Sequence, residues 1–203
     1  DYDHPLIIKV ASIPQIRIQV YFIDNEEYFK KKFIFKGADG KYFKDNDERS
    51  MFFCRGVLET VKKLGWMPDI VHCHGWMTAL MPVYLKSVYK NDPHFSNAKI
   101  IYTHYKHDEK LKFSKDLPTK LDFDELPTGE LNLNGLADVN KLHEIGIQWS
   151  DAVSHGSPDI DEGLLDLIKK TDKSVLEYHD EEQTVEAHQN FYDKVLSENG
   201  VLV

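Results

Sequence analysis

The stretch WMPDIVHCHGWMTAL, residues 66–80, decides the fold that this chain adopts. After the chain breaker Pro68, the apolar pair Ile70-Val71 is typical of the core of a short buried strand. The polar run from His72 to Trp76 follows where this strand would leave its sheet, and an apolar helix pattern comes next. Ligands of open α/β sheets bind outside the carboxyl ends of parallel strands. The stretch therefore predicts a strand, a turn that lines a ligand site, and the start of a helix.

Strands and helices alternate along the chain from residue 45 onward, which predicts an α/β fold. The strand at residues 69–73, a helix over 79–88 and a strand at 99–103 form a β-α-β unit. Such a unit normally makes a parallel pair with a right-handed crossover, so we expect a single doubly wound, mostly parallel sheet. Later residues continue the alternation with strands at 151–155 and 174–178 and helices over 136–149 and 181–196. Between the two strands another helix is expected, with Ser157 as its N-cap and Pro158 at its first position.

The remaining segments predict a hairpin and a long loop. The β-branched runs at residues 5–13 and 16–23 flank Pro14-Gln15, which indicates an N-terminal β-hairpin. Residues 45–47 supply N-cap chemistry for an amphipathic helix that Gly65 ends. The polar residues 104–134 indicate a long loop with short helical pieces.

Length and composition exclude several classes of protein. A chain of 203 residues suffices for one domain with a real core, and we expect a single domain over 1–203. A net charge of −9 argues against a nucleic-acid surface, and no apolar run approaches the roughly 20 residues of a membrane span. Cys54 and Cys73 are the two cysteines and no leader pattern opens the chain, so we expect a cytoplasmic protein. Too few ligands surround Cys73 for a zinc site, and we expect no metal and no cofactor.

Four blocks of sequence carry a family resemblance: 20–25, 45–59, 66–80 and 151–158. In this order they resemble the N-terminal, Rossmann-like domain of bacterial glycogen and starch synthases, which are GT-B glycosyltransferases of family 5. In particular the chain is similar to a short, single-domain version from the Bacteroidetes group. The resemblance implies half of a GT-B fold, and transfer of glucose from ADP-glucose to an α-1,4-glucan with retention of configuration. The chain is expected to lack the family's Lys-x-Gly-Gly loop and its second Rossmann-like domain, and so to be incomplete or inactive alone.

The resemblance implies substrate-binding roles for His74, Trp76 and Thr78, which match the family's motif. Trp76 would stack on a sugar face while His74 forms a hydrogen bond with the sugar. The alternatives from residue chemistry are that Trp76 packs in the core and that the strand-end histidines cap backbone groups or line a polar crevice.

Other positions depart from the family. Gly75 and Met77 stand where the family has an acidic residue and a histidine, and Tyr105-Lys106 stand at its His-Asn pair. We therefore expect no catalytic residue in this chain.

Two functional hypotheses follow. In the first, the chain is the acceptor-side domain of a glucan synthase, with α-glucan and ADP-glucose as ligands and a partner domain supplied elsewhere. In the second, it is a catalytically silent module that binds glucan or another protein. Loss of the family's first strand would expose a sheet edge, so a homodimer is an expected arrangement.

Overall fold

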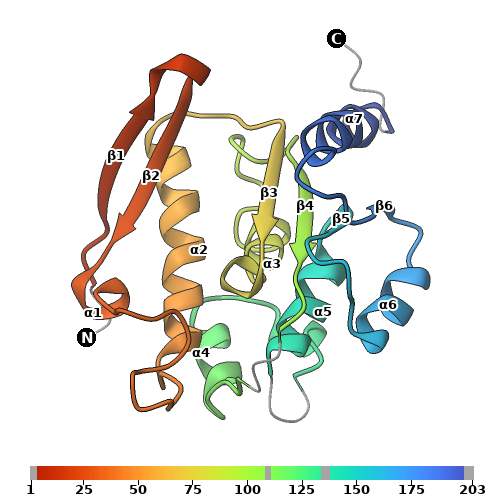
Figure 1. Cartoon of the computed structure of the whole chain (residues 1–203). Helices are drawn as coiled ribbons and strands as arrows, with labels where there is room; N and C mark the ends of the chain where they lie inside the picture. Colours follow the sequence, from red (N-terminus) through yellow and green to blue (C-terminus); the bar gives the residue numbers. More distant parts are fainter. Residues whose placement is uncertain (1–3, 108–110, 134–137, 199–203) are drawn as a thin grey trace.

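A four-stranded parallel sheet forms the centre of the computed structural model, which describes residues 4–107, 111–133 and 138–198 (Figure 1). Its strand order is β3-β4-β5-β6, and the pairs β3/β4, β4/β5 and β5/β6 are all parallel. The strands span Ile70–His74 (β3), Lys99–His104 (β4), Ala152–His155 (β5) and Ser174–Leu176 (β6). The predicted α/β fold with a parallel sheet is confirmed.

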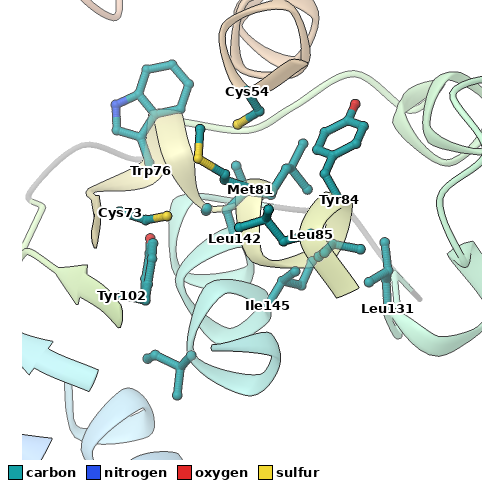
Figure 2. Close-up of a cluster of buried hydrophobic side chains, with 14 of the residues drawn as sticks. Cys54, Cys73, Trp76, Met81, Tyr84, Leu85, Tyr102, Leu131, Leu142 and Ile145 are labelled. Carbon is teal, nitrogen blue, oxygen red and sulfur yellow. The ribbon is translucent and has the colours of Figure 1, made fainter. Parts of the chain in front are cut away.

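Helices cover both faces of this sheet, as expected for a doubly wound arrangement. On one face, side chains of β3, β4 and β5 pack with α2, α3, α5 and α6 in the main core (Figure 2). These helices span Asn46–Lys63 (α2), Met81–Lys86 (α3), Val139–Trp149 (α5) and Glu162–Lys169 (α6). On the other face, Ile101 and Ala152 pack against Phe191 and Val195 of α7, Thr184–Ser197. Because strand side chains alternate, each strand contributes to both layers.

The predicted N-terminal hairpin is also confirmed, and it stands apart from the main sheet. β1 (Ile7–Ile13) and β2 (Ile18–Asp24) pair antiparallel around the 3₁₀ turn η1, Pro14–Ile16. The hairpin lies beside α2 (Figure 1), where a Cβ added at Gly56 would lie 3.6 Å from Ile23 Cδ1 of β2. The short helix α1, Glu26–Phe29, follows the hairpin with Asn25 as its N-cap.

Gly65 ends α2, as predicted. It has φ of +67°, donates its N–H to Lys62 O at 2.9 Å, and Trp66 donates to Val61 O at 3.1 Å. This pair of bonds is the Schellman arrangement. At the other end Asp45 holds the N-cap position, but its carboxylate pairs with Lys31 instead of the helix backbone.

The loop after β4 contains the expected short helical pieces, α4 (Leu117–Phe123) and the 3₁₀ turn η3 (Thr128–Glu130). Three ion pairs hold α4 and its C-cap residue against α2. Lys120 lies 2.8 Å from Asp47 and 2.7 Å from Glu48, and Arg55 pairs with Asp124. The loop is therefore anchored to the domain at α4.

The predicted start of the helix after β5 is wrong. α6 begins at Glu162, and its N-cap is Asp161, whose carboxylate accepts from the Gly163 N–H at 3.0 Å. Ser157 instead accepts from the Lys106 N–H at 3.1 Å, so its hydroxyl joins the segments that follow β4 and β5. None of the helices in the described ranges is both long and apolar enough to cross a membrane.

Candidate functional site

Three neighbouring strands end together at one edge of the parallel sheet, and each ends in a histidine. His74 closes β3, His104 closes β4 and His155 closes β5. Backbone hydrogen bonds hold the next residues in place, because Gly75 donates to Thr103 O and Gly156 donates to His104 O, both at 2.9 Å. This is the carboxyl edge at which α/β sheets bind their ligands. We call His74, Gly75, His104, Tyr105, His155 and Gly156 the strand-end rim.

On the face toward α7, His72 is held by hydrogen bonds at both ring nitrogens. Nδ1 lies 2.7 Å from the Tyr192 hydroxyl and Nε2 lies 2.6 Å from the Thr103 hydroxyl, which in turn lies 2.5 Å from Ser154 Oγ. Burial, with His74 and His188 nearby, lowers the pKa of His72 to about 3. The ring is therefore neutral at pH 7 and serves to join β3, β4 and α7.

His74 lies on the same face but is exposed at the rim. Its Nδ1 is 2.9 Å from the Tyr105 hydroxyl, and its ring centroid is 4.1 Å from that of His72. Partial burial, followed by the nearby His188, lowers the pKa of His74. Its Nε2 atom forms no hydrogen bond within the part of the chain that the structure describes. Of the three matched site residues, His74 is thus the one that offers a polar atom at the rim.

A second group of histidines lies on the opposite face of the sheet. His104 Nε2 is 2.7 Å from His155 Nδ1, and His143 of α5 stacks on His107 with centroids 5.2 Å apart. His143 Nδ1 lies 2.6 Å from the hydroxyl of Tyr102. Burial is the main cause that lowers the pKa of His104 to about 4 and of His143 to about 3. No set of three or more His, Cys, Asp or Glu side chains among the described residues could hold a metal ion.

Neither His143 nor His155 was predicted from the sequence as a site residue. His155 ends a predicted strand just as His74 does, so its position at the rim could have been inferred from that pattern. His143 gives no such signal, because its helix brings it under the sheet only through tertiary packing. It is fully buried, and its Nε2 has no hydrogen-bond partner within the described ranges.

Trp76 lies in the core. It is 4% exposed, and its ring packs against Phe35 at 5.3 Å and Phe113 at 5.9 Å between centroids. These contacts favour the packing alternative, since stacking on a sugar would require the ring to be uncovered. Thr78 is partly buried in the 3₁₀ turn Trp76–Thr78, and its hydroxyl donates to Gly75 O at 3.1 Å. The structure therefore places His74 at the rim and the other two matched residues behind it.

Comparison with known proteins identifies the family. The family model described as the starch synthase catalytic domain matches residues 2–171. The chain belongs to this family. It is 37% identical over 154 residues to a glycogen synthase of Chlorobium phaeovibrioides, which covers 75% of the chain. It is also 46% identical over 99 residues, or 48% of the chain, to a glycogen synthase of Chlorobium limicola.

A solved structure supports the fold. The catalytic domain of starch synthase IV from Arabidopsis thaliana, bound to ADP and acarbose, superposes with a TM-score of 0.58 at 20% identity. The match covers 92% of this chain and 35% of that one, and it confirms the expected half of a GT-B fold. The chain likewise spans only 31% of the C. phaeovibrioides protein and 20% of the C. limicola protein.

Proposed function

We propose that this chain is the acceptor-side domain of a synthase that transfers glucose from ADP-glucose to an α-1,4-glucan. Family membership over residues 2–171 supports the reaction class, and the similar fold of a starch synthase bound to ADP and acarbose supports the ligand classes. The observation that carries the proposal is the strand-end rim, where β3, β4 and β5 end side by side, with His74 exposed and Tyr105 in contact with it. That edge is where a sheet of this type receives its substrate.

The chemistry available at this rim is hydrogen bonding by neutral groups. Burial lowers the pKa values of His74, His104 and His155, so these rings are uncharged at pH 7. His104 and His155 are buried and bond to each other, so among the three rings it is the exposed His74 that can offer a hydrogen bond to a ligand. Sugar hydroxyls are neutral and need such partners, whereas a leaving diphosphate needs cations or helix N-termini. The rim thus suits the glucan better than the nucleotide. The nucleotide would then bind to a second Rossmann-like domain, supplied by residues outside 1–203 or by a partner protein.

The second hypothesis, a catalytically silent module that binds glucan or protein, is favoured by the departures at the rim. Gly75 provides no side chain where the family has an acidic residue, and the Tyr105 ring lies directly over it, 3.6 Å from where a Cβ would be. In this arrangement the chain could still hold a saccharide at His74 without contributing to the transfer step.

The two hypotheses separate by experiment on the full chain. Incubation with isotope-labelled ADP-glucose and glycogen, together with the second Rossmann-like domain that the first hypothesis requires, should lengthen the glucan if the first holds. Saturable binding of maltoheptaose without any transfer supports the second. Absence of both transfer and binding refutes both glucan functions and leaves a protein-binding role.

Association and localisation are also proposals. Hairpin residues that include Ile7, Val10 and Phe22 are about half exposed, and an apolar hairpin of two strands is normally covered. We expect a partner domain or a second copy of the chain to cover it, which the mass in solution from light scattering would reveal.

Both cysteines are free thiols, which supports a reducing compartment such as the cytoplasm.

A further inference from the structure

The ring of Tyr105 is fitted among the ends of three strands. It follows β4, and it lies against the glycines that follow β3 and β5. A Cβ added at Gly156 would come within 2.3 Å of the ring, and one at Gly75 within 3.6 Å. Gly75 also has φ of +71°, a conformation that other residues rarely adopt. The two glycines therefore leave the space that this ring fills.

From this position the Tyr105 hydroxyl reaches His74 Nδ1 at 2.9 Å. Burial raises the pKa of Tyr105, so the phenol keeps its proton at neutral pH and is available as a donor. A neutral imidazole carries one proton, on one of its two nitrogens. When Nδ1 accepts a hydrogen bond, the proton must lie on Nε2.

We infer that Tyr105 is a positioning residue that fixes His74 in the tautomer with its proton on Nε2, so that this N–H is offered as a donor at the strand-end rim. The ligand class is a neutral sugar hydroxyl, and this part of the inference rests on the proposed function. Tyr105 acts through His74 and does not itself have to contact the glucan.

The neighbouring histidine shows why His74 is the one that can act. His72 has both nitrogens engaged, by Tyr192 and by Thr103, so it has no free polar atom for a ligand. His74, which is exposed on the same strand, has one ring nitrogen engaged by Tyr105 and one without a hydrogen-bond partner among the described residues. The pair of tyrosines also supplies a matched comparison, since each places a hydroxyl on the Nδ1 atom of a histidine of β3.

The tautomer can be measured without any ligand. In the full chain labelled with ¹⁵N-histidine, the nitrogen chemical shifts distinguish a protonated from an unprotonated ring nitrogen. We expect His74 to carry its proton on Nε2 in the wild type and to become a mixture of tautomers in Tyr105→Phe. The matched control, Tyr192→Phe, should alter the signals of His72 and leave the tautomer of His74 unchanged. A wild-type His74 with its proton on Nδ1, or an unchanged tautomer in Tyr105→Phe, would overturn the inference.

A second variant and a ligand complete the test. Gly156→Ala keeps the phenol but displaces its ring, and should also give mixed tautomers at His74. Loss of one such hydrogen bond should weaken maltoheptaose binding about three- to tenfold in Tyr105→Phe, whereas Tyr192→Phe should bind as the wild type does.

If the wild type shows the expected tautomer but no maltoheptaose binding, the proposed function fails while the positioning role of Tyr105 stands. If it binds maltoheptaose and Tyr105→Phe leaves both tautomer and affinity unchanged, the positioning role fails and the proposed function stands.

Discussion

The buried histidines should make this domain sensitive to acid, and His143 allows the effect to be measured at one residue. His143 is fully buried, and burial, reinforced by His107 and His104, lowers its pKa to about 3 in the folded protein. In the unfolded chain an ordinary histidine has a pKa of about 6.5. Between these two values the unfolded state binds more protons than the folded state, so the free energy of unfolding decreases as the pH falls below about 6.5.

The magnitude follows from the slope of about 1.4 kcal/mol per pH unit for one proton. Between pH 7.5 and pH 5 the protein should lose about 2 kcal/mol of stability through His143 alone. His104, which is 2% exposed and has a pKa of about 4, should contribute a similar loss. Together they amount to about 4 kcal/mol, a large share of the roughly 5–15 kcal/mol that stabilises a typical domain.

Urea unfolding of the wild type and of His143→Leu at pH 7.5, 6 and 5 tests this reasoning. Tyr102 keeps a partner in the variant, because its hydroxyl also donates to Gly75 O at 3.2 Å. The variant should lose about 2 kcal/mol less than the wild type between pH 7.5 and pH 5. The control Leu142→Val, in the neighbouring buried position, should lower the free energy of unfolding by the same amount at every pH. Equal acid-induced losses in the wild type and in His143→Leu would refute the assigned pKa of His143.

Three other substitutions, two of them paired with a control variant, have effects that chemical denaturation can measure. Trp76→Ala should destabilise the domain by about 3–5 kcal/mol because its ring is buried among aromatic side chains; a change below about 1 kcal/mol would contradict its placement in the core. Gly146→Ala should lower the free energy of unfolding by about 1–3 kcal/mol, since the new methyl group would lie 2.7 Å from the buried ring of Tyr102. In the control Gly129→Ala the new methyl group has no atom within 4 Å, so stability should change by less than about 0.5 kcal/mol. Asp161→Ala should lower the free energy of unfolding by about 1 kcal/mol, because α6 loses its N-cap. If Ser157→Ala lowers it by more than Asp161→Ala does, the helix begins where the sequence predicted.

The sequence predicted the sheet well because its strands are short apolar runs with clear breakers. Residues 70–74, 99–104 and 152–155 each carry such a run, and their alternation with amphipathic helices gives the parallel topology. The start of α6 could not be predicted in the same way. Ser157-Pro158 is a strong local signal for a helix start, but Ser157 receives its hydrogen bond from Lys106, far away in the sequence. Tertiary contact decides this boundary, and Asp161 supplies the cap instead.

The strand-end position of His74 was predicted from the sequence, but the contacts around the candidate site residues were predicted only in part. The strand-end location of His74 follows from the period of β3, whereas the burial of Trp76 depends on Phe35 and Phe113, which are remote in sequence. The contact between Tyr105 and the glycine after β5 likewise arises from the pairing of two strands. Sequence spacing thus indicates which residues reach the rim, but the contacts that cover or orient them come from the packing of distant segments.

Calorimetric titration of the full chain with maltoheptaose, for the wild type and for His74→Ala, tests most directly whether the strand-end rim holds an α-glucan. His74 is exposed, so its replacement should leave the fold intact, as circular dichroism can verify. We predict saturable binding by the wild type and about tenfold weaker binding by the variant, as expected for the loss of one or two hydrogen bonds. Equal affinity in both proteins, or no binding by the wild type at millimolar maltoheptaose, would contradict the account.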